Sequence, residues 1–139
     1  MTIIVYKSGV MCSDSQISAS GIRSGTFKKI HKINGWLVGA AGTCEGMEGI
    51  FDWVREGMPE DAAKIGSEAG GILVSPEGKV FHVEDALVPY EVTADFHVQG
   101  SAFGIATGAL AMGATPEEAV RIAIKYDTGC GGKVQTIKL

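Results

Sequence analysis

A threonine at position 2 stands directly behind the initiator methionine and begins the β-branched run TIIVY. Chain ends ordinarily fray for a few residues unless something holds them, so a strand that begins at once is unusual. We therefore expect the terminus itself to be a working part of the molecule, although a threonine that opens a strand is ordinarily a β-former and no more.

The other side chains that commonly do chemistry argue against a metal or disulfide site. The cysteines are odd in number and form no CxxC pair: Cys12, Cys44 and Cys130. The three histidines show no metal-ligand spacing and no shared partner: His31, His82 and His97. We expect no metal, no other cofactor and no disulfide framework, and the free thiols fit a reducing, cytoplasmic compartment.

Length and composition bound the remaining possibilities. The 139 residues suit a single domain, 1–139, that buries a core without disulfides or metal. The net charge of −4 is spread along the chain, which argues against a nucleic-acid partner. TIIVY is too short for a membrane span or a signal peptide, and no basic stretch precedes it. We expect neither a membrane nor a targeting segment.

Three hairpins are predicted. The first joins TIIVY to VMCSDSQIS, read as one return strand, through a turn at Ser8 and Gly9 that places Asp14 opposite Ile3. The second joins FKKIHKI to WLVGAAG through Asn34-Gly35. The third is GILVSPEGKVFHVED, which turns at Pro76 to Gly78.

The register of the second hairpin selects one lysine. Counting outward from Asn34-Gly35 pairs Lys29 with Ala40, so Lys29 and Gly42 approach each other at the open end. Lys28 points to the opposite face because side chains alternate along a strand. We expect Lys29, and not Lys28, to reach a site built at the open ends of both hairpins.

Three helices complete the pattern. Apolar residues at helical spacing predict a helix over 43–57, small residues predict one over 101–114, and a capping box begins one at Thr115. Strands are predicted around FHVQGS and GKVQTIKL. The order of elements indicates an α+β protein with antiparallel sheets and helices outside them.

Seven short segments resemble one known family. They occur in its order and with its approximate spacing between Thr2 and Val134: TIIV, DSQIS, KKI, AGT, GSAFGIATGAL, EEAVRIAI and DTGCGG. Each is weak alone, but together they resemble the proteasome β-subunit and its bacterial relative HslV, which are N-terminal-nucleophile hydrolases. The resemblance implies a four-layer αββα sandwich of antiparallel sheets.

The resemblance also implies a threonine-type peptidase. A threonine hydroxyl is a poor nucleophile at neutral pH, and a free α-amine with a pKa near 8 can serve as its base. This requires that Met1 be removed, which the small Thr2 side chain favours. An ungapped alignment would put Met1 at the nucleophile position, but the pairing of Asp14 with Ile3 favours Thr2.

By similarity, the other catalytic roles fall as follows. Lys29 lowers the pKa of the threonine pair, and Asp14 holds that lysine in place. The backbone N–H of Gly42 donates to the oxyanion. Ser101 and Asp127 orient the terminal amine together with Cys130, where the family usually has serine. A thiol is a weaker donor than a hydroxyl, so we expect a looser cluster.

Substrate contacts and partners also follow from the resemblance. The family's substrate-binding positions correspond to Ser18, which would hydrogen-bond the substrate backbone, and to Ala40 and Cys44. The expected substrate is an unfolded polypeptide or peptide, cleaved inside a homo-oligomeric ring that an ATP-dependent unfoldase could serve.

One departure concerns length. Between Gly57 and Gly71 the family carries a long second helix, whereas this chain has only MPEDAAKIGSEAG. We expect a shortened outer helical layer, which bears on the ring contacts and the docking surface for an unfoldase.

Two alternatives stay open. The first is a catalytically silent homologue that keeps Met1 and acts as an assembly or binding module. The second is an amidase on a small substrate, because a fold does not fix a function.

We expect Lys29→Ala to abolish hydrolysis with little loss of stability, and Lys28→Ala to be nearly neutral.

Overall fold

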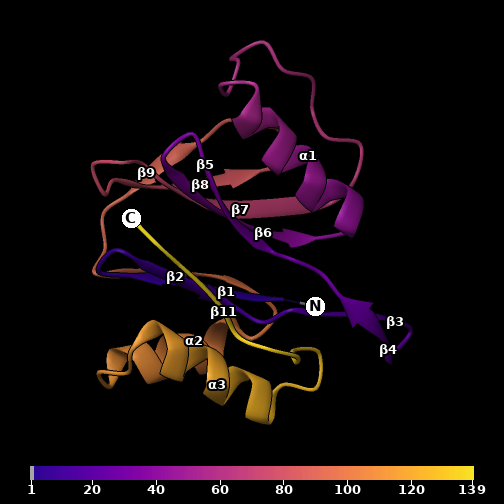
Figure 1. Cartoon of the computed structure of the whole chain (residues 1–139), viewed down its shortest axis with the longest axis vertical. Coiled ribbons are helices and arrows are strands. Elements are labelled where there is room, and N and C mark those ends of the chain that lie inside the picture. Colours follow the sequence, from indigo (N-terminus) through magenta and orange to yellow (C-terminus); the bar gives the residue numbers. More distant parts are fainter. Residues whose placement is uncertain (1) are drawn as a thin grey trace.

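The computed structural model describes residues 2–139, which form four layers (Figure 1). The helix α1 (Cys44–Arg55) covers one sheet, while α2 (Phe103–Ala111) and α3 (Pro116–Tyr126) cover the other. The two sheets pack face to face between the helical layers. The expected removal of Met1 concerns a residue outside the described ones.

Both sheets are antiparallel. The first has the order β10-β1-β2-β11, with bounds Phe96–Gly100, Ile3–Lys7, Val10–Ser13 and Gln135–Lys138. The second runs from β5 to β9, with bounds Ile30–Ile33, Trp36–Gly42, Ala69–Val74, Val80–Glu84 and Tyr90–Val92. The predicted α+β sandwich of four layers is confirmed.

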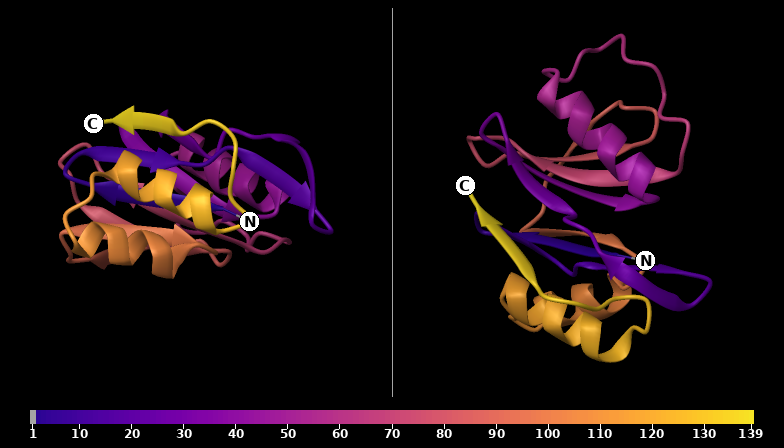
Figure 2. Two further views of the ribbon diagram at one scale, coloured as in Figure 1. Left: turned by 90° about the horizontal axis from the view of Figure 1, so that it is seen from below. Right: turned by 45° about the vertical axis from the view of Figure 1, so that its right-hand side comes forward.

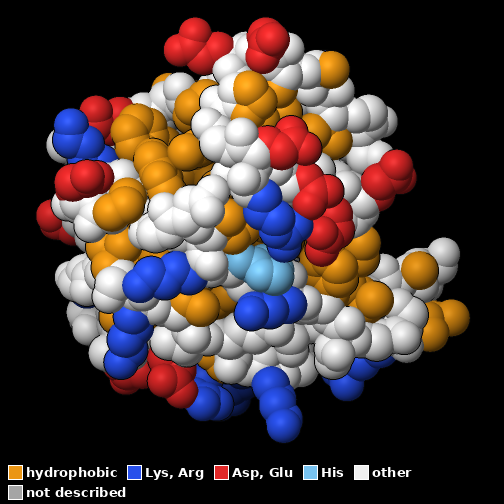
Figure 3. Space-filling view, turned by 45° about the horizontal axis from the view of Figure 1, so that its top comes forward, with side chains coloured by type: hydrophobic (Ala, Val, Ile, Leu, Met, Phe, Trp, Pro, Cys, Tyr) orange, Lys and Arg blue, Asp and Glu red, His pale blue; other side chains and the backbone are white. Residues whose placement is uncertain are grey.

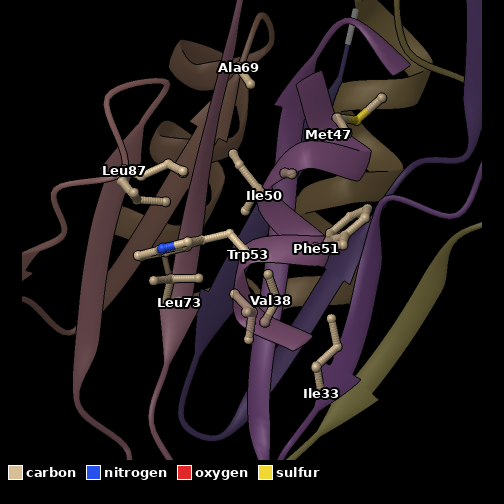
Figure 4. Close-up of a cluster of buried hydrophobic side chains, with 12 residues drawn as sticks. Ile33, Val38, Met47, Ile50, Phe51, Trp53, Ala69, Leu73 and Leu87 are labelled. Atoms are coloured by element: carbon tan, nitrogen blue, oxygen red, sulfur yellow. The ribbon is translucent and has the colours of Figure 1, made fainter. Parts of the chain in front are cut away.

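Three hydrophobic clusters fill the spaces between the four layers. One lies under α1, where Ile50 and Trp53 approach Val38 of the second sheet (Figure 4). A second lies between the sheets and includes Ile4 and Ile72. A third lies between the first sheet and helices α2 and α3. Each sheet is therefore apolar on both faces, as a buried layer requires.

The predicted turns and registers are confirmed. Ser8 and Gly9 both have positive φ, and Lys7 pairs with Val10 across that turn. Asn34 and Gly35 likewise have positive φ, which suits a two-residue hairpin turn. The Ala40 N–H donates to the Lys29 carbonyl oxygen at 3.0 Å, so the register that pairs these two residues is observed.

The predicted single return strand VMCSDSQIS is wrong. It divides into β2 and β3 (Gln16–Ala19), with Asp14 and Ser15 between them. Strand β3 pairs instead with β4 (Ile22–Thr26), and this two-stranded sheet extends from the side of the molecule near the N-terminal end (Figures 1 and 2). Asp14 therefore turns inward at a break in the strand. Strands β4 and β9 were not expected from the sequence.

The helical termini follow local chemistry. The Thr43 hydroxyl caps α1 by accepting from the Gly46 N–H at 2.9 Å. At α3, Thr115 and Glu118 form the predicted capping box.

None of the described helices is long and apolar enough to cross a membrane.

The outer layer over the second sheet is thin, as expected. Residues 57–68 contain no helix, so α1 alone covers this face. An apolar groove of about 610 Å³ remains there, with Trp36, Trp53 and Leu87 among its lining residues. The space-filling view, tilted to bring the α1 side forward, shows hydrophobic side chains exposed in patches among charged ones (Figure 3).

Candidate active site

A buried ion pair lies next to the N-terminal strand. Lys29 Nζ donates to Asp14 Oδ1 at 3.0 Å, and neither residue is exposed. The same carboxylate oxygen accepts from the Ile3 N–H at 3.1 Å. Asp14 therefore links the lysine to the peptide unit that joins Thr2 to Ile3.

The second oxygen of Asp14 is held by a loop from the far end of the chain. Asp14 Oδ2 accepts from the Gly131 N–H at 3.1 Å, and the Gly131 carbonyl oxygen accepts from the N–H groups of Ser15 and Gln16. A side chain at Gly131 would clash with that of Gln16. A buried carboxylate is tolerated where charge and hydrogen bonds compensate for lost water, and this one has both.

Thr2 is held through its carbonyl group. It is 3% exposed, and its carbonyl oxygen accepts from the Ser101 N–H at 2.9 Å and from the Ser101 hydroxyl at 3.4 Å. Gly100 has a φ of +124°, and a Cβ there would clash with the Thr2 carbonyl oxygen. Only glycine fits this close approach without strain.

Cys130 joins the last two predicted residues to this region. The Ser101 side chain lies close enough to Cys130 to act on the pKa of its thiol, and the Cys130 N–H donates to the Asp127 carbonyl oxygen at 3.2 Å. Burial, followed by the charges of Asp14 and Asp127, raises the pKa of Cys130 to about 12. The thiol is therefore a neutral S–H group at physiological pH, able to donate a weak hydrogen bond.

The Asp127 carboxylate also shapes this loop. Its Oδ1 accepts from the Gly129 N–H at 2.7 Å, which fixes the turn that leads from α3 to Cys130. Asp127 therefore lies close to Cys130.

A pocket opens beside these residues. It has a cavity volume of about 790 Å³, and four of the predicted site residues line it: Thr2, Ser18, Gly42 and Ser101. Gly42 has a φ of +121° at the end of β6, where a Cβ would clash with the Glu68 carbonyl oxygen. The backbone of Gly42 can therefore lie at the pocket wall without a side chain in front of it.

Two predicted substrate contacts do not reach this pocket. Ala40 is fully buried in the cluster under α1, because alternation along β6 turns its side chain toward the helix. Cys44 is exposed at the first position of α1 and does not line the pocket. The geometry brings together the eight other predicted residues.

Sequence reasoning missed several supporting contacts. Gln135 Oε1 accepts from the Lys29 N–H at 3.1 Å, and Gly100 and Gly131 allow the close approaches described above. The pattern GS before a helix and the run GCGG carried a signal for these glycines, although a turn would give the same signal. The sequence carried no signal for the role of Gln135, because its partner Lys29 is over 100 residues away in the chain.

The prediction that the histidines share no partner is wrong for two of them. His82 Nδ1 and His97 Nε2 lie 3.1 Å apart, and His82 Nε2 lies 2.6 Å from Glu84 Oε1. All three line the same pocket as Thr2. His82 and His97 come from different sheets, so sequence spacing could not reveal their contact.

Known proteins resemble this chain in structure more clearly than in sequence. No model of a protein family matches the sequence. No curated protein matches it either. Among solved structures, eukaryotic HslV from Trypanosoma brucei is 18% identical, covers 100% of both chains and superposes with a TM-score of 0.74.

A second similar protein is BPH of Thiobacillus denitrificans. Its complex with epoxomicin is 15% identical, covers 99% of this chain and 97% of BPH, and has a TM-score of 0.70. The structure described without that compound is 16% identical over 99% and 96% of the two chains, also with a TM-score of 0.70.

The four layers of sheets and helices, together with superpositions that cover nearly the whole of each compared chain, define the fold class. The chain has the fold of the N-terminal-nucleophile hydrolases. Within that class, its fold is HslV-like and proteasome-like.

Proposed function

We propose that this protein is a threonine peptidase that uses Thr2 as its N-terminal nucleophile and cleaves peptide bonds of unfolded polypeptides. The observation that carries the proposal is the buried pair of Lys29 and Asp14, bonded to the peptide unit that follows Thr2. A lysine placed without exposure inside a sheet sandwich is costly, and such groups concentrate at functional sites.

The proposed chemistry begins with the Thr2 hydroxyl. Once the residue before it is removed, the free α-amine takes the hydroxyl proton, and the oxygen attacks the substrate carbonyl carbon. The Gly42 N–H at the pocket wall donates to the oxyanion that forms. The amine then returns its proton to the leaving amine, and a water molecule hydrolyses the ester by the reverse sequence.

The neighbouring groups favour this proton transfer. The positive charge of Lys29 stabilises the deprotonated hydroxyl and disfavours a second positive charge on the α-amine. In this scheme Asp14 fixes the lysine, and Ser101, which donates to the Thr2 carbonyl oxygen, orients the amine together with Cys130. The activity needs no cofactor in this scheme.

The maturation test uses untagged protein expressed in its native form. Its intact mass is expected to correspond to a chain that begins at Thr2, because only then is the α-amine free. Incubation with epoxomicin, the compound bound by BPH, is expected to add one inhibitor mass, which peptide mapping assigns to Thr2. A chain that retains Met1 and takes no inhibitor would favour the silent homologue.

We further propose that the peptidase works in the cytoplasm as a homo-oligomeric ring, with an unfoldase as a candidate partner. Enclosure would keep a nonspecific peptidase away from folded proteins. The exposed apolar side chains support subunit contacts; Met112 is 90% exposed, Val88 is 71% and Ile22 is 70%.

Native mass spectrometry at micromolar concentration is expected to show a closed oligomer of one subunit type. A charged substitution at the tip of the β3–β4 hairpin, Ile22→Glu, is expected to weaken this assembly. The corresponding change at an exposed polar site, Ser24→Glu, serves as its control. Monomer alone in the unaltered protein would contradict the ring.

A further inference from the structure

The pocket beside Thr2 has a second polar region on its far wall. His82 and Glu84 belong to β8, and His97 belongs to β10. Tyr90 of β9 adds its ring, with the centroids of Tyr90 and His82 5.2 Å apart. These four residues from three strands line the same pocket as Thr2.

These residues occupy positions that a sandwich would ordinarily fill with apolar side chains. His82 pairs in register with Ile72, and His97 pairs with Tyr6; both partners belong to the cluster between the sheets. The two histidines therefore face the space between the sheets. A polar network there contributes less to folding than hydrophobic packing would, so its presence calls for another reason.

The network has a defined direction. Glu84 Oε1 lies 2.6 Å from His82 Nε2, and His82 Nδ1 lies 3.1 Å from His97 Nε2. With neutral rings, His82 donates to the carboxylate and accepts from His97. Burial, and then the charge of His82 when protonated, lower the pKa of His97, which keeps its ring uncharged near neutral pH.

The remaining oxygen of Glu84 lies against Gly70, which lines the same pocket. A Cβ added to Gly70 would come within 2.6 Å of Glu84 Oε2 and 2.8 Å of the Gln99 side-chain amide. The glycine thus leaves room for both polar groups to converge at the pocket. The Glu84 side chain is 57% exposed, so its carboxylate can receive a ligand.

The charge of the pocket wall selects the ligand. The described residues that line the pocket include two carboxylates, Glu68 and Glu84, and no lysine or arginine. Tyr90 presents an aromatic ring, whose face attracts cations. We propose that Glu84, supported by His82 and His97, binds a positively charged side chain of the substrate polypeptide.

The distance along β10 indicates where that side chain stands. Gly100 adjoins the Ser101 N–H that holds Thr2, and His97 is three residues earlier on the strand. Three strand residues span about 10 Å, which is also the reach of two or three substrate residues. The basic side chain is therefore expected within about three residues of the cleaved bond.

The specificity rests on the proposed peptidase function, and its test compares fluorogenic peptides that differ at one position. Lysine, norleucine or glutamate is placed in turn at each of three positions on either side of the cleaved bond. At one position, kcat/KM is expected to be roughly tenfold higher for lysine than for norleucine, the size of one charge-assisted hydrogen bond. Glutamate is expected to be the poorest of the three.

Glu84→Gln is expected to bring the ratio of lysine to norleucine close to one. Glu91→Gln is the matched control, since Glu91 is exposed on β9 and pairs with Phe81, on the opposite face of the sheet. It is expected to leave that ratio unchanged. Equal rates for the lysine and norleucine peptides, or a preference that survives Glu84→Gln, would overturn the assignment while leaving the peptidase function intact.

A binding measurement separates this site from catalysis. Argininamide is titrated into the full chain while the imidazole signals of His82 and His97 are followed by NMR. They are expected to shift with argininamide, to respond far less to norleucinamide, and to lose the argininamide response in Glu84→Gln. If no peptide is cleaved but this response is present, the peptidase proposal fails and the cation site stands. If the signals do not respond, the cation site is wrong.

Discussion

Thr2→Ala is expected to reduce peptide hydrolysis by about a thousandfold or more, the scale on which removal of a catalytic nucleophile acts in other hydrolases. The loss follows from chemistry, because alanine has no hydroxyl to form the acyl intermediate. The backbone contacts of residue 2 to Ser101 use the carbonyl oxygen, which alanine keeps. Thr2→Ser retains a hydroxyl and is expected to keep measurable activity.

The assay measures hydrolysis of a short fluorogenic peptide by each variant, after mass spectrometry has verified that its chain begins at position 2. Thermal melts accompany the rates, since a buried methyl group is lost in both variants. Thr2→Ala protein that folds, begins at position 2 and retains the activity of the parent would exclude Thr2 as nucleophile.

Much of the fold was predictable from local sequence. The turn at Asn34-Gly35 sets a register by its own geometry, and this register alone placed Lys29 opposite Ala40. The capping box at Thr115 likewise begins a helix through contacts within four residues. Such features depend on neighbours in the chain, so the sequence carries their full signal.

The break at Asp14 and Ser15 was not predictable in the same way. The run VMCSDSQIS has the small and polar residues of an exposed strand, and nothing within it signals a change of partner. The break is stabilised by Gly131, whose carbonyl oxygen accepts from two consecutive N–H groups after Asp14. That contact spans more than a hundred residues, as does the contact between Asp14 and the Gly131 N–H.

The residues of the candidate site show the same contrast between contacts set by neighbours in the chain and contacts set by distant residues. Lys29 and Asp14 could be selected because each has a register position in a hairpin that the sequence defines. The pocket's second polar region could not, because His82 and His97 meet only when the two sheets pack. For Ala40 the predicted register was right, but the predicted substrate contact was wrong, because its side chain faces the hydrophobic core.

Lys29→Ala is expected to lower peptide hydrolysis by about a hundredfold to a thousandfold, the usual cost of losing one electrostatic contact to the reacting groups. The structure corrects the expectation of little change in stability. Lys29 is fully buried against Asp14, so its removal leaves a carboxylate without its charge partner. Breaking a buried ion pair typically costs about 3–5 kcal/mol in the free energy of unfolding.

A second variant separates the two effects. Lys29→Met combined with Asp14→Asn removes both charges and keeps one acceptor oxygen for the Ile3 N–H. It is expected to regain part of the stability lost in Lys29→Ala, because no uncompensated charge stays buried, and to remain inactive. Lys28→Ala is the matched control: Lys28 is exposed in the segment just before β5, so both activity and stability should stay near those of the parent.

Chemical denaturation gives the free energy of unfolding for each variant, and the fluorogenic peptide gives its rate under conditions where the variant is folded. A single substitution at Lys29 that lowers stability while folded protein cleaves peptide at the parental rate would make the ion pair purely structural. The argument for Thr2 as nucleophile would then lose its main support, because the charge that activates the terminus would be absent from the mechanism. An inactive but folded double variant, in contrast, is the result expected if the ion pair acts on the reacting groups as well as on the fold.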